Sequence, residues 1–327
     1  MMEDKTKRVL KFLLRILITG LLLAVVFSRI DLRQLGGAVQ NARWLFLFIV
    51  WALSITGFWL QTLKMQIVLR KQQCEVDIGT VFGVSAVTTL YGLIMPSLLS
   101  TSVKWYILKC KTGRGTNVFS SMAYNQVTDM VVRILVGLLA VIVTNPGGGP
   151  KSPILCAIIA VVMIIGLVLM LNRWTGEKFL VFVRYILRPF PEMIRKNVGK
   201  ILEQIKVFQT ASLAFHLLIV TISLLGALLS VMVYVFAAKA AAIDVSPVVL
   251  AWQSVVIFLL GRLPISVANL GVREFTLIEF LALYGVKAPV ALLMSMIIFS
   301  STILLGVIGA GFQVVWMLGS RVSKESD

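Results

Sequence analysis

The sequence predicts an all-α polytopic membrane protein, and three observations lead to this fold class. Hydrophobic residues make up 59% of the chain, and its mean hydropathy is +0.96. Apolar runs long enough to span a bilayer, which takes about 20 residues, recur along the 327 residues. The formal net charge of +17 comes mainly from the connections between these runs. Such a charge favours the anionic face of a membrane as its partner, and we expect no nucleic acid to bind.

Eight hydrophobic segments follow from the apolar runs, and two of them are interrupted by proline and polar residues. The segments cover residues 9–29, 44–68, 77–109 (broken), 117–144, 153–171, 210–238, 247–284 (broken) and 288–318. The first segment has no small-residue cleavage site, so we interpret it as a retained helix rather than a signal peptide. We therefore expect a single integral membrane domain over residues 1–327, with about six full transmembrane helices plus two broken helical hairpins.

The basic residues indicate how the broken segments cross the membrane, because Lys and Arg concentrate on the cytoplasmic side. If all eight segments crossed, the basic connection 172–209 would lie outside while the N-terminus lay inside. If both broken segments return to the side they came from, most of the 31 basic residues lie inside. Six basic residues would lie outside, and the three arginines at 29–43 among them are the one feature that does not fit this topology well. The charges therefore predict two re-entrant hairpins in a cell (plasma or inner) membrane, with both termini in the cytoplasm.

This topology also predicts an inverted repeat. Each half would contain three full crossings and one hairpin, and an odd number inverts the second half. The halves would be 9–144 and 153–318, and residues 96–104 are similar to 264–273 with one residue inserted. Interrupted segments in corresponding positions of two halves indicate a transporter's binding site. We expect both hairpin tips to lie near the midplane, close to Asp129.

The connection 172–209 is expected to form basic amphipathic helices on the cytoplasmic side. Apolar residues such as Phe179, Val183 and Leu187 recur at helical spacing opposite Lys178 and Arg184. Helices of this kind lie in the membrane interface and favour anionic lipids. A solvated segment that only fixes the topology is an equal alternative.

Several charged residues are predicted to lie within the membrane segments, where ionisable side chains are functional candidates. They are Lys64, Asp129, Arg133, Arg262, Arg273, Glu274 and Glu279. Asp129 and Arg133 lie four residues apart, so they share a helix face and can pair. A salt bridge that only locks helices together is the plainer alternative. Lys64, near the end of its segment, is interpreted as a side chain that snorkels to the interface.

These charges predict a site for an anionic head group. The planar fork of arginine suits phosphate, and free amides at a helix start near Gly271 would add donors. Asp129, Glu274 and Glu279 would balance the cations. A carboxylate beside an arginine is also typical of a proton relay, which would make the protein an H⁺-coupled carrier. The candidate substrate-binding residues are Arg273, Glu274, Arg262, Asn269, Gly271, Glu279, Lys104, Ser100, Thr101, Asn125, Asp129 and Arg133.

Enzymatic motifs are missing from the sequence, so we expect no enzyme, no cofactor and no metal. It contains no HExxH, GxSxG, Walker loop or paired-Asp phosphotransferase motif. His216 is the single histidine. It lies in an apolar run, where we expect it to take part in the core or in a hydrogen bond between helices.

The second break resembles the signature of a known family. Leu263-Pro264 followed by Asn269-Leu270-Gly271-Val272-Arg273-Glu274 is similar to the "LP…GGLGVREG" motif of the lysylphosphatidylglycerol synthase transmembrane-region, or flippase-like, family. Pro96 to Lys104 is similar to the family's "PGRxGExxR" element, and the segment around Asp129 to its "ER-x-x-D" helix. The resemblance extends from about Val9 to Val315.

The departures from the family pattern bear on the substrate. Ser100-Thr101 replaces Gly-Glu, Lys104 replaces Arg, and Asn125-Gln126 replaces Glu-Arg. Asn269 stands in place of a glycine, and Phe275 in place of a small residue. The first-half site is therefore less charged than in the family, and we expect its lipid to differ from the family's best-known substrate.

The resemblance implies a protein that moves lipids between leaflets or assists a lipid-modifying pathway. The aminoacylating domain of bifunctional members follows the membrane part, whereas this chain ends at Asp327, so we expect neither that domain nor synthase activity. The leading hypothesis is a translocase for an anionic or zwitterionic phospholipid or a polyprenyl-linked lipid. The alternatives are a lipid- or glycolipid-modifying enzyme with Asp129 or Glu274 as base, and a proton-coupled small-solute carrier. A lipid-synthesis enzyme and a second copy of the chain remain open as partners.

Overall fold

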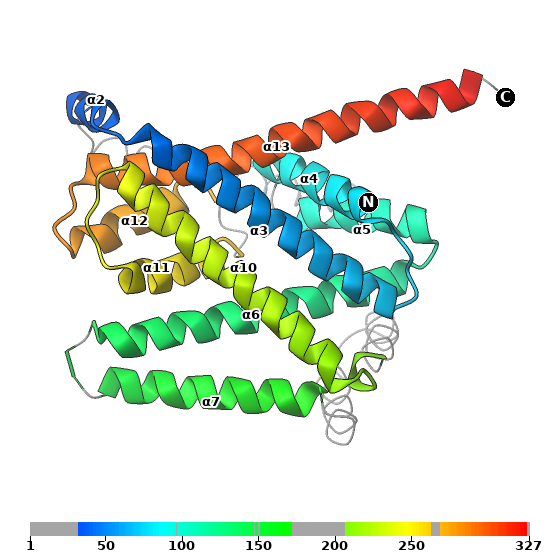
Figure 1. The fold of residues 1–327 in the computed structure, drawn as a ribbon, viewed down its shortest axis with the longest axis horizontal. Helices are drawn as coiled ribbons and strands as arrows, with labels where there is room; N and C mark the ends of the chain where they lie inside the picture. Colours follow the sequence, from blue (N-terminus) through cyan, green and yellow to red (C-terminus); the bar gives the residue numbers. More distant parts are fainter. Residues whose placement is uncertain are drawn as a thin grey trace, which may run out of the picture. The chain divides into compact units, whose positions relative to one another are not determined.

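A computed structural model shows the described part of the chain as a set of α-helices (Figure 1). It describes residues 32–95, 97–146, 148–149, 151–171, 207–262 and 269–325. Every regular element in these ranges is a helix, which confirms the all-α class. The predicted segment 9–29, residues 172–206 of the basic connection, Pro96 and 263–268 lie outside the described residues.

Within the described ranges, the helices that are long and apolar enough to cross a membrane coincide with predicted segments. They are α3 (Trp44–Lys71), α6 (Gly115–Thr144), α10 (Leu213–Ala240) and the stretch Ala288–Met317 of α13 (Ala288–Glu325). A further apolar helix, α7 (Lys151–Leu171), also matches a predicted segment and packs along α6 (Figure 1). The predictions of helices at these positions are confirmed.

Both broken segments form pairs of shorter helices, as predicted. The first consists of α4 (Ile78–Ile94) and α5 (Ser97–Thr112), and the second of α11 (Pro247–Leu260) and α12 (Val272–Ala282). The 14 residues of α11 and the 11 of α12 rise about 21 and 16 Å, whereas the hydrocarbon core is about 30 Å thick. Neither helix of the second pair is therefore long enough to cross by itself.

The chain forms two compact units that interleave along the sequence. Unit 1 consists of Met1–Thr56, Gly83–Lys104 and Leu229–Asp327, and unit 2 of Gly57–Phe82 and Trp105–Leu228. Helix α3 contributes its first half to unit 1 and its second half to unit 2, whereas α10 contributes in the reverse order. The units do not coincide with the predicted halves 9–144 and 153–318, and the inverted repeat stays a prediction.

In unit 2, the loops that flank the first broken segment touch each other. The Arg114 guanidinium donates to the Gln73 carbonyl over 3.0 Å, and the Asn117 amide donates to the Gln72 carbonyl over 3.2 Å. The loop before α4 and the loop after α5 are therefore neighbours. This contact is what a return of the first broken segment to its own side requires.

In unit 1, glycines allow α13 to lie directly against α4. A Cβ atom on Gly309 would overlap the carbonyl oxygen of Ala86, and one on Gly306 would come within 2.6 Å of Leu93 Cδ1. Small residues at such crossings let helix backbones approach closely in membranes. Helix α13 also packs against α12 and against the short helix α2 (Leu32–Gln40).

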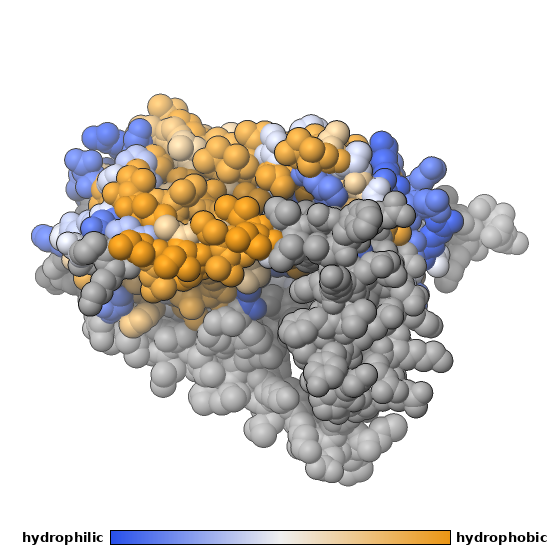
Figure 2. Space-filling model, turned by 90° about the horizontal axis from the view of Figure 1, so that it is seen from below, coloured by the Kyte–Doolittle hydropathy of each residue, from blue (hydrophilic) through white to orange (hydrophobic). Residues whose placement is uncertain are grey.

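The outer surface of the described helices is largely apolar. Leu45, Val143 and Leu213 are each more than 70% exposed. Hydrophobic side chains cover much of the described face seen in Figure 2, and hydrophilic residues gather at its margins. A surface of this kind is costly in water and suited to lipid.

Candidate functional site: two buried ion pairs

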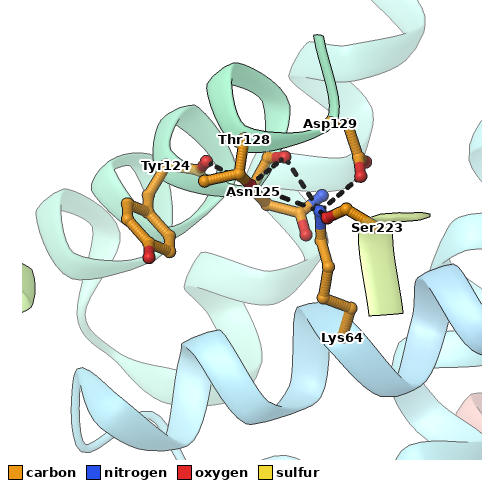
Figure 3. A network of polar contacts seen from close by, with 6 residues as sticks. All are labelled: Lys64, Tyr124, Asn125, Thr128, Asp129 and Ser223. Atoms are coloured by element: carbon orange, nitrogen blue, oxygen red, sulfur yellow. Dashed lines mark hydrogen bonds and ion pairs between the residues drawn. The ribbon is translucent and has the colours of Figure 1, made fainter. Parts of the chain in front are cut away.

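The first polar cluster of the candidate site lies in unit 2, where α3, α6 and α10 meet around Lys64 (Figure 3). Its ammonium nitrogen lies 2.5 Å from Asp129 Oδ1 and 2.9 Å from Ser223 Oγ. The Asn125 carbonyl oxygen at 3.2 Å and Thr128 Oγ1 at 3.3 Å complete its surroundings. The Lys64 side chain has 0% exposure. A charge buried at this depth requires such partners, because removing it from water is expensive.

The spacing of residues on α6 builds this cluster. Asn125, Thr128 and Asp129 lie three and four residues apart, so they share one face of the helix. The Thr128 hydroxyl donates to the Tyr124 carbonyl over 2.9 Å. Its oxygen therefore keeps a lone pair for the ammonium.

Asp129 uses only one of its carboxylate oxygens within the described chain. Oδ1 accepts from Lys64, whereas Oδ2 makes no hydrogen bond to a described residue. The Asp129 side chain keeps 8% of its surface exposed. Arg133 lies one turn further along α6, and its charge acts on Lys64. The carboxylate therefore retains an acceptor atom that the ion pair leaves unused.

The second polar cluster lies in unit 1, where α12 begins. Arg273 forms an ion pair with its neighbour Glu274, and both side chains are buried. Arg273 Nε donates to Ser295 Oγ on α13 over 2.9 Å, and this hydroxyl lies 3.0 Å from Glu274 Oε1. The guanidinium also sits 4.8 Å from the centre of the Phe299 ring. The pair thus ties the first turn of α12 to α13.

Glu274 also caps its own helix. The Gly271 amide donates to Glu274 Oε2 over 2.7 Å, which is half of a capping box. A carboxylate in the first turn complements the positive end of the helix dipole as well. The start of α12 near Gly271 is confirmed, but the Gly271 amide that we expected to face a ligand is bonded within the protein.

The turn before α12 explains one departure from the family signature. Asn269 adopts a φ of +59° and Gly271 one of +81°. Asparagine tolerates this left-handed region better than most residues, so it can stand where a glycine is usual. A Cβ atom on Gly261 would come within 2.9 Å of the Asn269 side-chain nitrogen, so this side chain lies over the end of α11.

The remaining predicted site residues lie on or beside the broken helices. Arg262 is exposed, and its guanidinium lies 4.6 Å from the centre of the Phe258 ring. In the first turns of α5, Ser100 is buried, Thr101 is exposed and Lys104 is half-buried. Glu279 is half-buried on α12. The predicted approach of the hairpin tips to Asp129 involves both units and stays a prediction.

Lys64 is the residue that the sequence-based prediction misjudged. The expectation that it snorkels is wrong, because the side chain is wholly buried and pairs with Asp129. A lysine and an aspartate that each interrupt a long apolar helix were the available signal. Ser223 and Ser295 were also missed, since a serine in an apolar helix gives no such signal.

His216 has the structural role that we expected for it. Its Nδ1 atom lies 3.0 Å from the Tyr124 hydroxyl, so the contact joins α10 to α6. Among the residues the structure describes, no group of His, Cys, Asp or Glu side chains is arranged to hold a metal ion.

Membrane-length helices, two interrupted segments and buried ion pairs together define a multi-pass integral membrane protein. The family model described as lysylphosphatidylglycerol synthase TM region matches residues 12–310. The chain belongs to this family, which confirms the resemblance noted in the sequence. No curated protein matches the chain, and no solved structure does either.

Proposed function

We propose that the protein is a flippase-like lipid translocase, which moves a lipid head group between leaflets through a polar intramembrane cavity. Its substrate would be an anionic or zwitterionic phospholipid or a polyprenyl-linked lipid. The observation that carries the proposal is the Lys64–Asp129 pair, held among three membrane-length helices. The family's connection with lipid modification or flipping supports it.

The free energy that it costs to bury a charge supports this function. A purely structural membrane bundle is stable with apolar contacts, and a buried ion pair adds little net stability to it. Ionisable groups inside membrane proteins therefore mark paths for polar substrates. Head groups would follow the polar residues while their acyl chains stay in the surrounding lipid.

The cations of unit 1 are proposed to make the first head-group contacts. Arg262 is exposed beside the second break, and its planar fork suits a phosphate. Lys104 on α5 and the Arg273–Glu274 pair would also contact the head group, with Glu279 as a counter-charge. The sequence has no nucleotide-binding motif, so we expect transport without ATP hydrolysis. We place the protein in the cell membrane with both termini in the cytoplasm.

Reconstituted vesicles with leaflet-reporting fluorescent phospholipids test the proposal. We expect the wild-type protein to speed the movement of labelled phospholipids between leaflets. We expect Arg262→Gln to slow this movement several-fold. Lys239→Gln is the matched control, because Lys239 is also exposed and lies 5.2 Å from the centre of an aromatic ring, that of Phe236. Exchange no faster than in protein-free vesicles would contradict the function, and new lipid products would favour the enzyme alternative. Wild-type rates in Arg262→Gln would contradict only the assignment of Arg262.

A further inference from the structure

We propose that an anionic head group binds at Lys64 together with one proton on Asp129, so that transport of anionic lipids is proton-coupled and electroneutral. This inference rests on the proposed function and adds a co-substrate to it. The ligand chemistry is a phosphodiester that carries a single negative charge.

The hydrogen bonds of the Lys64 ammonium limit how an anion can reach it. A lysine has three N–H donors, and the oxygens of Asp129, Ser223, Asn125 and Thr128 already surround them. An incoming anion can therefore reach the nitrogen only by displacing one of these oxygens. Asp129 is the one negatively charged partner among them, so a phosphate replaces it with a group of the same charge.

Replacing Asp129 with a phosphate at Lys64 leaves the charge of Asp129 without its partner. An ionised Asp129 beside a bound phosphate would place two negative charges against one lysine, deep in a medium that solvates charge poorly. A proton on Asp129 restores one positive and one negative charge. Binding of the anion and protonation of the carboxylate are then favourable only together.

The proton would bind at the second carboxylate oxygen of Asp129. Asp129 Oδ2 makes no hydrogen bond to a described residue, and its side chain is not completely buried. A proton can therefore bind before the Lys64 contact at Oδ1 breaks. Once protonated, the carboxyl group can itself donate a hydrogen bond to the phosphate.

The charged groups near Asp129 come from α3 and α6. Lys64 on α3 is its ion-pair partner, and Arg133 on α6, whose charge acts on Lys64, has a contact of its own. Helix α10 contributes the neutral Ser223, and its His216 lies two turns earlier, bonded to Tyr124. Helix α7, which packs on α6, has its only charged residue at its first position, Lys151.

Zwitterionic lipids should behave differently, and this separates coupling from binding alone. The ammonium of such a head group can pair with an ionised Asp129 while its phosphate contacts Lys64. No proton is needed to balance the charge in that arrangement. The same site is therefore expected to couple anionic lipids to protons and zwitterionic lipids to none.

The direct test counts protons when lipid binds to the purified full-length protein in weakly buffered detergent solution. With short-chain phosphatidylglycerol, a pH-indicator dye should report uptake of about one proton per bound lipid. With short-chain phosphatidylcholine, the uptake should be close to zero. Asp129→Asn should bind phosphatidylglycerol without uptake, whereas the exposed-carboxylate control Glu75→Gln should keep it. Equal proton uptake with both lipids, or no proton uptake with either, would overturn the proposal. This comparison needs only the wild-type protein.

Transport in vesicles gives the second measurement, with the membrane potential clamped by potassium and valinomycin. A pH gradient should drive fluorescent phosphatidylglycerol from the acidic to the alkaline leaflet several-fold faster, whereas the potential alone should not. Asp129→Asn should lose this response. If phosphatidylglycerol moves without regard to the gradient, the coupling fails and the translocase function remains. If neither lipid moves, the translocase function fails, and the proton count still decides what happens at Lys64.

Discussion

At the scale of single residues, the molecule places opposite charges where each has a specific partner. Lys64 on α3 pairs with Asp129 on α6, whereas Arg273 pairs with Glu274, its neighbour on the same helix. Each pair also includes one serine from a further helix, Ser223 or Ser295. Removing one charge of such a pair leaves the other buried and uncompensated, which is more damaging than removing both.

This difference predicts the outcome of a double-mutant cycle at Lys64. Lys64→Met should lower the free energy of unfolding in detergent by about 3–5 kcal/mol, because Asp129 loses its partner. Adding Asp129→Leu to this variant should recover most of the loss. Calorimetric or chemical unfolding of the purified variants measures both values. A double variant as unstable as the sum of the two single variants would show that the pair does not act as a unit.

The partner of Asp129 could not be predicted from the sequence. The sequence marked Asp129, Arg273 and Glu274 as charges at depth, but the partner of Asp129 came from a helix 65 residues earlier. Which faces of α3 and α6 meet depends on how the helices rotate as they pack. Neither hydropathy nor spacing along one helix carries that information.

At the scale of elements, the boundaries of the helices were largely predictable. A bilayer imposes both length and apolar composition on a crossing helix, so hydropathy alone located α3, α6, α10 and α13. Proline and glycine located the interruptions. The close contact of α13 with α4 was not predictable, since a glycine in an apolar helix does not reveal which backbone lies against it.

Two glycines of α13 provide a matched test of this contact. Gly309→Ala should destabilise the protein by about 1–3 kcal/mol, because its Cβ atom would overlap the backbone of Ala86. Gly311→Ala is the same substitution two residues later, where nothing lies within 4 Å. That change should be neutral or slightly stabilising, since alanine is the better helix former. Thermal unfolding of the two variants side by side decides between a packing effect and a helix-propensity effect.

The start of α4 depends on the ionisation of a carboxylate. Asp77 accepts hydrogen bonds from the Thr80 amide at 2.7 Å and the Thr80 hydroxyl at 2.6 Å, and these bonds lower the pKa of Asp77. The cap is therefore complete at neutral pH and is lost as the pH falls through this lowered pKa. We expect faster amide exchange in the first turn of α4 for Asp77→Ala, and little change for Asp77→Asn, which also caps. Exchange in Asp77→Ala as slow as in the wild type at neutral pH would show that the cap has no role.

At the scale of the whole molecule, the interleaved units explain why sequence halves and structural units differ. Long helices such as α3 and α10 supply residues to both units, so the chain cannot be divided by a single cut. Composition and charge nevertheless predicted the all-helical membrane class. Every crossing segment must be apolar and helical in the lipid bilayer, and the connections must be polar in water. The arrangement of the helices depends on long-range contacts that have no local signal.

The topology that the charges predict can be tested by labelling single cysteines in a variant without Cys74, Cys110 and Cys156. Glu75→Cys lies in the loop before α4, and Lys111→Cys lies in the last turn of α5, so both should react from the cytoplasmic side. Pro146→Cys, in the turn between α6 and α7, should react only from outside. Labelling of Glu75→Cys and Lys111→Cys from opposite sides would contradict the re-entrant prediction.

The pairing of opposite charges within each cluster has a consequence for the membrane barrier. At a distance of several ångströms, Lys64 with Asp129 forms a dipole rather than a net charge, and so does Arg273 with Glu274. The field of a dipole falls off much faster than that of an ion, so small ions outside have little attraction to these sites. While both ion pairs are intact, the protein should be impermeable to sodium, potassium and chloride. A conductance would then arise only in variants that remove one member of a pair and leave the other charge in place.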